Sequence, residues 1–85
     1  MLYEEIKKNF PEIEKLFTQK ELAEFKNSVK DDLCLYHFGL GTWLRNNLLQ
    51  PENNKLYLLF IQNGVTNPDD MSEFIINEFY NYLNL

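Results

Sequence analysis

Cysteine, histidine and arginine are nearly absent from this sequence of 85 residues, which contains one of each: Cys34, His37 and Arg45. A single cysteine excludes an intramolecular disulfide, and a single histidine excludes the usual Cys/His patterns of a zinc site. We therefore expect no metal ion and no cofactor, and we expect Cys34 to be a buried, unreactive thiol. This cysteine usage is typical of the reducing cytoplasm, which is the compartment that we expect.

Long hydrophobic runs are also missing. The longest, residues 56–61, is far shorter than the roughly 20 residues of a membrane-spanning helix. The first residues, 1–5, contain two acidic side chains and no basic segment followed by an apolar stretch, so we expect no signal peptide. A membrane is therefore not an expected partner.

Positive charge is scarce, and the formal net charge is −5. Proteins that bind nucleic acid need a basic surface to contact phosphates, so nucleic acid is not an expected partner either. No lysine or arginine follows Lys55, whereas four acidic residues do: Asp69, Asp70, Glu73 and Glu78. The C-terminal third of the chain is therefore acidic.

Apolar residues recur at spacings of three and four along most of the chain, which is the pattern of helices with one buried face. Leu2, Ile6 and Phe10 begin this pattern, and the alternation typical of strands is weak everywhere. The sequence contains no low-complexity linker and no internal repeat. We predict one all-α domain over residues 1–85, folded as a compact bundle of four to five short helices.

Several short motifs predict where helices begin and end. Thr18-Gln19-Lys20-Glu21 is a capping box, and Asn67-Pro68-Asp69-Asp70 combines an N-cap, a proline at the first helical position and two acids near the positive end of the helix dipole. Pro11 begins a helix by the same rule. Asn53 or Asn54 can cap a helix that Gly64 ends, and Pro51 ends the helix before it.

Residues 36–47 concentrate the rare residue types, including Trp43 and two of the three glycines. Within a predicted helix over residues 31–48, His37, Gly41 and Arg45 would follow one another on nearly one face. Because a glycine in a helix interior costs roughly 1 kcal/mol, we expect a break or very close packing at Gly39 and Gly41. An arginine in a chain that otherwise uses lysine indicates fork-shaped recognition of a carboxylate or phosphate.

Two segments resemble an uncharacterised family of small bacterial domains of unknown function. The stretch from His37 to Asn46 matches a motif H-F-x-x-G-x-x-[IL]-R-N, and Pro68 to Ser72 matches P-D-D-[AM]-S. The resemblance covers roughly residues 31–83 and implies no particular activity. It supplies candidate residues, which are His37, Gly41, Arg45 and Asn46 from the first motif and Pro68, Asp69, Asp70 and Ser72 from the second.

Each candidate has a structural and a functional interpretation. Arg45 is expected to pair with Asp69 or Asp70 and clamp two helices together, or to bind a ligand or partner. Trp43 and His37 are expected to be core or boundary side chains. The same two acids are first of all helix-start residues, because adjacent carboxylates diverge by about 100° on a helix and clamp a metal poorly.

The function that we predict is a small protein–protein interaction module that binds a protein partner or itself and has no catalytic residues. The last helix carries more apolar surface than one core face needs, so its expected partner-facing residues are Ile76, Tyr80 and Leu83. Arg45 and Asn47 are expected polar anchors.

The alternative is a binder of, or an enzyme acting on, a small anionic or nucleotide-like ligand. Its pocket would be lined by His37, Arg45 and Asn46, with Asp69 or Asp70 acting as a base. Taken together, the expected binding residues of the chain are His37, Arg45, Asn46, Asn47, Asp69 and Asp70.

Overall fold

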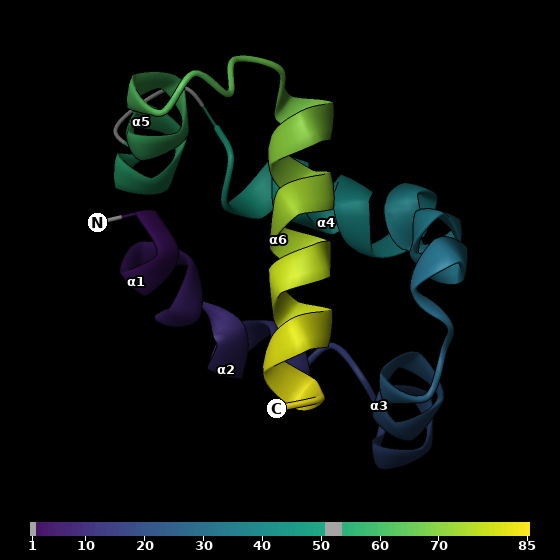
Figure 1. Ribbon diagram of the computed structural model, residues 1–85. Coiled ribbons are helices and arrows are strands. Elements are labelled where there is room, and N and C mark those ends of the chain that lie inside the picture. The colour runs from purple at the N-terminus through teal and green to yellow at the C-terminus, as the bar shows by residue number, and fades with distance from the viewer. Residues whose placement is uncertain (1, 51–53) are drawn as a thin grey trace.

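A computed structural model describes residues 2–50 and 54–85 (Figure 1). The described residues form α-helices and two other helical segments, with no strand among them. The predicted all-α fold is confirmed. The elements, in chain order, are α1 (Leu2–Lys7), α2 (Phe10–Glu14), α3 (Gln19–Lys26), η1 (Lys30–Tyr36), η2 (His37–Gly41), α4 (Thr42–Asn47), α5 (Lys55–Gln62) and α6 (Pro68–Leu83).

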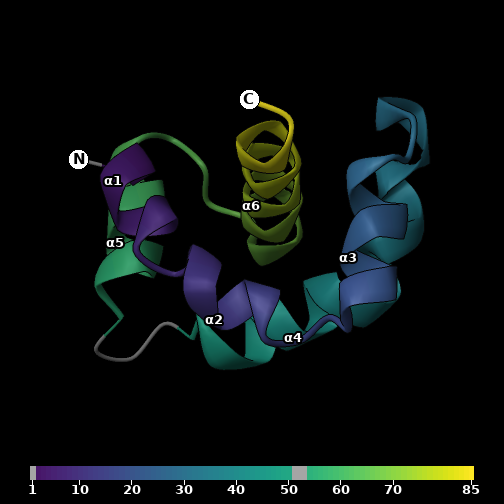
Figure 2. The same ribbon diagram turned by 90° about the horizontal axis from the view of Figure 1, so that it is seen from below.

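Helix α6 is the centre of the fold. Figure 2, which looks nearly along its axis, shows the other helices in an open arc around it, with α1 and α5 on one side and α3 on the other. Its buried side chains are Met71, Ser72, Ile75, Ile76 and Phe79. A central helix packs against neighbours in several directions, so its apolar surface is wide. The excess apolar surface that the sequence indicates is therefore used inside the domain.

The predicted helix boundaries of α3 and α6 are confirmed by their caps. At α3, the Glu21 amide donates to Thr18 Oγ1 over 3.1 Å, and the Thr18 amide donates to Glu21 Oε1 over 2.9 Å. At α6, the Asp69 amide donates to Asn67 Oδ1 over 2.8 Å, and Pro68 is the first helical residue. These side chains satisfy amides that have no acceptor within the helix.

Both ends of α5 also lie where the sequence predicts them. Asn54 Oδ1 accepts from the Tyr57 amide at the start, while the alternative cap Asn53 and the predicted stop at Pro51 lie outside the described residues. At the other end Gly64 has a φ of +84°, a left-handed conformation that glycine adopts without steric cost. The Gly64 and Val65 amides donate to the carbonyls of Ile61 and Phe60, as in a Schellman C-cap.

The helix predicted over residues 31–48 is not continuous. Residues 30–36 form a 3₁₀ helix, residues 37–41 form a π-helical turn, and only residues 42–47 are α-helical. The widened π turn contains both glycines, whose low helix propensity makes departure from α geometry inexpensive. The expected break is thus confirmed.

Aromatic rings fill the core between α6 and the N-terminal helices. Phe79 is fully buried, and its ring centroid lies 5.4 Å from that of Phe10 and 5.5 Å from that of Phe25. Phe25 also meets Tyr36 edge-on at 4.8 Å. The 3₁₀ segment is therefore tied to the same core as α3 and α6.

Cys34 corrects one expectation from the sequence: its side chain is exposed, and its Sγ donates to the main-chain oxygen of Asp31 over 3.6 Å. The 3₁₀ segment turns Leu33 inward and leaves Cys34 and Leu35 outside. Within residues 2–50 and 54–85, no helix has the length and apolar character needed to cross a membrane.

Candidate functional site

Arg45 joins the two sequence motifs. From α4 it reaches the start of α6, where its Nε lies 3.4 Å from Asp69 Oδ1 and its Nη1 donates to Ser72 Oγ over 3.1 Å. Its Nη2 donates to Thr42 Oγ1 over 3.0 Å and to the main-chain oxygen of His37 over 3.5 Å. All three nitrogens of the guanidinium thus contact other groups of the protein. Of the two acids that the sequence offers as ion-pair partners, Asp69 is the one that pairs with Arg45.

Thr42 and Ser72 complete this network, although neither was among the expected binding residues and only Ser72 belongs to one of the two motifs. Ser72 is fully buried, and its hydroxyl donates to the main-chain oxygen of Asp69 over 2.9 Å while accepting from Arg45. Thr42 Oγ1 likewise donates to the Phe38 main-chain oxygen over 2.6 Å. Each hydroxyl group is therefore oriented by donating a hydrogen bond to a main-chain oxygen, and each also accepts a hydrogen bond from Arg45. Asp69 and Ser72 are three residues apart on one helix, and this spacing could have indicated from the sequence that their side chains lie on the same helix face.

Gly41 lies beneath the guanidinium. A Cβ atom placed on it would be 3.0 Å from Arg45 Nη1, 3.6 Å from Ser72 Oγ and 3.7 Å from His37 Nδ1. The expected close packing is confirmed at this glycine. Gly39 differs, because nothing lies within 4 Å of the corresponding position.

We expect the two glycines to respond oppositely to alanine. Gly39→Ala should raise the free energy of unfolding by about 0.5–1 kcal/mol, because alanine lowers the entropy of the unfolded chain and meets no neighbour. Gly41→Ala should lower it by about 1 kcal/mol or more, because the new methyl group displaces the guanidinium from Ser72. Urea titrations of the two variants measure the difference, and equal effects in both would contradict the close packing at Gly41.

The side chains of the other predicted binding residues do not join the network. His37 contributes its main-chain oxygen, and its partly buried ring lies edge-on to Phe38 at 5.3 Å. Asn46 and Asn47 are exposed on α4, and Asn47 Nδ2 donates to the Trp43 main-chain oxygen over 2.9 Å. Asp70 is exposed at the start of α6.

The residues predicted to face a partner lie mostly inside the domain. Ile76 is 3% exposed and belongs to the core. Tyr80 is partly buried, and its hydroxyl donates to the Ser28 main-chain oxygen over 2.6 Å. Leu83 is partly buried against the core. Ile76 is therefore a core residue, and Tyr80 and Leu83 have only part of their surface available to a partner.

Comparison with known proteins places nearly the whole chain in one family. A family model described as a domain of unknown function, DUF6794, matches residues 4–83. The chain belongs to the DUF6794 family. No curated protein and no solved structure matches it.

In this DUF6794 domain three of the four most exposed large apolar side chains lie on η1 and η2 or just before them in the chain. Leu35 is 74% exposed, Phe38 is 82% exposed, and Val29, just before η1, is 63% exposed. We call these three residues the apolar patch. Leu85, which is 97% exposed, stands apart at the C-terminus.

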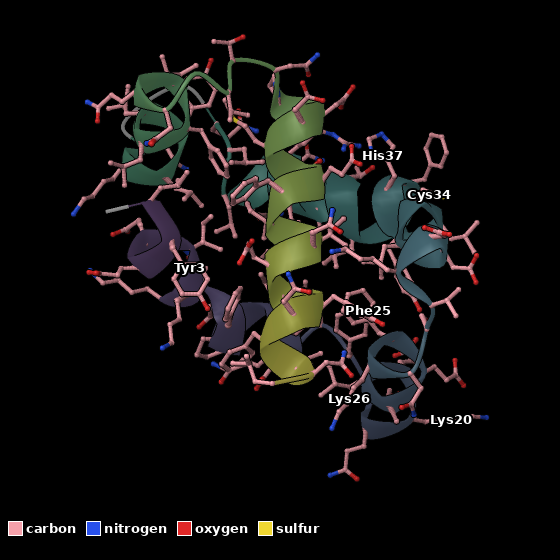
Figure 3. All side chains as sticks on the ribbon, viewed as in Figure 1. Tyr3, Lys20, Phe25, Lys26, Cys34 and His37 are labelled. Atoms are coloured by element: carbon pink, nitrogen blue, oxygen red, sulfur yellow. The ribbon has the colours of Figure 1, made fainter. Side chains whose placement is uncertain are left out.

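A hollow of about 520 Å³ lies between the η1–η2 segment and α6, and Phe38 of the apolar patch is one of its lining residues. Figure 3 shows two of its lining residues, Cys34 and His37, on the η1–η2 segment to one side of α6. The full lining is Lys30, Asp31, Leu33, Cys34, His37, Phe38, Glu73, Ile76 and Asn77. Among the described residues, no group of three His, Cys, Asp or Glu side chains could hold a metal ion.

Proposed function

We propose that this DUF6794 domain is a protein–protein interaction module without catalytic activity of its own, and that it contacts its partner through the apolar patch. The observation that carries the proposal is the exposure of Leu35 and Phe38, at 74% and 82%, on the consecutive segments η1 and η2, together with the hollow that Phe38 lines. Exposed apolar surface next to a concavity is a common feature of recognition sites.

The energetics favour a partner at this surface. Covering a leucine or phenylalanine side chain is worth about 1.5–3 kcal/mol, and aromatic side chains are common among the residues that dominate binding energy. The two side chains also lie outside the core, so a partner can cover them without disturbing the packing around α6.

The charge of the chain favours a different protein over a second copy. Two copies would bring together two chains that each carry a formal net charge of −5, whereas a basic partner would be attracted. Self-association through the patch is therefore the less favoured form of the same function.

The anion-binding alternative has less support. All three guanidinium nitrogens of Arg45 already contact Asp69, Ser72, Thr42 or the His37 carbonyl, so the guanidinium would have to leave these groups to bind a phosphate. The charge of Asp69 beside it also opposes an anion. We propose instead that the two motifs are a signature of the family because together they build this network.

The compartment that we propose is the reducing cytoplasm. The single cysteine, Cys34, is exposed, and an exposed thiol would be open to oxidation or mixed-disulfide formation in an oxidising compartment.

We expect the double variant Leu35→Ser/Phe38→Ser to lose at least tenfold in affinity for the partner while keeping the wild-type free energy of unfolding within about 0.5 kcal/mol. The measurement is affinity capture from a lysate of the source organism, followed by titration of the captured protein. Leu58→Ser is the matched control, because Leu58 is 52% exposed on α5. Equal binding by the wild type and the double variant would refute the proposed surface.

A further inference from the structure

We propose that the hollow between the η1–η2 segment and α6 binds an arginine side chain of the partner protein. This inference rests on the proposed function, since it names the chemistry that the interaction module recognises. The observation behind it is the composition of the lining, which combines an apolar floor, carboxylates from two different elements and an exposed aromatic ring.

The floor of the hollow is apolar and rigid. Leu33 is 4% exposed and Ile76 is 3% exposed, so both are held in the core and present only a small apolar surface to the hollow. Together with the exposed ring of Phe38, this floor can contact the methylene groups of an arginine stem, which favour apolar surroundings while the charged end stays near polar groups. A hollow of about 520 Å³ is within the roughly 300–1,000 Å³ range of ligand-binding pockets.

The two carboxylates in the lining of the hollow belong to the two elements on either side of it. Asp31 belongs to η1 and Glu73 belongs to α6, and both side chains are exposed. None of the ion pairs found among residues 2–50 and 54–85 uses either of them. Lys30 contributes one positive charge to the lining, so the carboxylates leave it net negative. A cation entering the hollow would therefore gain partners at both walls.

The aromatic ring distinguishes arginine from other cations. Phe38 lines the hollow and is 82% exposed, so most of its ring is accessible to a planar cation, with the His37 ring nearly perpendicular to it at 5.3 Å. Guanidinium groups stack on aromatic rings and present several N–H donors in one plane, whereas an ammonium is a compact charge. The side-chain oxygen of Asn77 on α6 adds a further acceptor type to the lining. This set fits a guanidinium better than an ammonium or a neutral side chain.

The second role of Phe38 links the hollow to the apolar patch. The same ring would be covered by apolar groups of the partner on one side and would contact the guanidinium on the other. The partner segment that fits this surface therefore carries an arginine next to apolar residues.

The test is a titration of the ¹⁵N-labelled full chain with Nα-acetyl-arginine methylamide, followed by NMR. Its neutral isostere Nα-acetyl-citrulline methylamide is the control probe. We expect saturable shifts of the amides of Leu33, Cys34, Ile76 and Asn77 with the arginine probe, and at least threefold weaker binding of the citrulline probe.

Substitutions identify the carboxylates. Glu73→Gln and Asp31→Asn should each weaken binding of the arginine probe by about three- to tenfold. Asp70→Asn is the matched control, because Asp70 is an exposed acid on the same helix that does not line the hollow. Equal binding of the two probes, or no effect of Glu73→Gln and Asp31→Asn, would overturn the assignment.

The outcome is separable from that of the proposed function. If the arginine probe does not bind but Leu35→Ser/Phe38→Ser still abolishes partner binding, the arginine pocket is wrong and the interaction surface stands. If the probe binds as expected but Leu35→Ser/Phe38→Ser leaves partner binding unchanged, the arginine pocket stands and the proposed interaction surface is wrong.

Discussion

Replacing Arg45 with alanine should lower the free energy of unfolding by about 2 kcal/mol or more. The exposed side of the network contributes little to this figure, since the Asp69 side chain is 60% exposed and water screens its charge. The larger part comes from the buried side. Ser72 is fully buried, and without Arg45 its hydroxyl oxygen loses its donor, as does the carbonyl of His37.

Urea denaturation followed by circular dichroism measures this change. Lys8→Ala is the control for loss of a cation, because Lys8 is 69% exposed and pairs with Glu5 at 3.5 Å on the surface, where the effect should stay within about 0.5 kcal/mol. Arg45→Lys should recover only part of the loss, since an ammonium cannot reach Asp69, Ser72 and Thr42 at once. An Arg45→Ala variant as stable as the wild type would show that the network does not hold α4 to α6.

Phe79→Ala should have the largest effect, a loss of about 3–5 kcal/mol. The ring is fully buried, and its neighbours Phe10, Phe17 and Phe25 come from the N-terminal half of the chain. Removing it leaves a cavity at the point where α6 meets these segments. Because a domain of this size rarely exceeds about 3–5 kcal/mol of stability, most of the variant should be unfolded at 25 °C.

Thermal and urea unfolding measure the effect, and Phe38→Ala supplies a control with the same chemical change. Phe38 is 82% exposed, so its removal should change the free energy of unfolding by less than about 0.5 kcal/mol. If Phe79→Ala unfolds completely, Phe79→Leu keeps part of the volume and should give a cooperative transition at lower urea. Similar stabilities of Phe79→Ala and Phe38→Ala would contradict the described core.

The helix ends could be predicted from the sequence because they depend on nearby residues. The capping box at Thr18, the left-handed Gly64 and the Asn67-Pro68 start of α6 each involve contacts within a few positions of the chain. Such local chemistry is independent of where other helices lie. The Arg45–Asp69 pair could also be anticipated, because a lone arginine and a distant acidic motif are complementary in charge and geometry.

The surface of the domain could not be predicted in the same way. Periodicity shows that Ile76 and Tyr80 lie outside the main apolar stripe of α6, but only the arrangement of the other helices around α6 shows that they are covered. The change to 3₁₀ and π geometry at residues 30–41 also could not be predicted from apolar spacing, beyond the break expected at Gly39 and Gly41. The exposure of Cys34 in this segment contradicts the prediction of a buried thiol.

The most direct test of the account is a double-mutant cycle between Arg45→Ala and Ser72→Ala, measured by urea denaturation. The central claim is that the two motifs meet in one network, with Arg45 Nη1 and the buried Ser72 hydroxyl 3.1 Å apart. The account predicts a coupling free energy of about 1 kcal/mol or more, since the second substitution removes a bond that the first has already broken. Additive effects, with a coupling below about 0.3 kcal/mol, would contradict it.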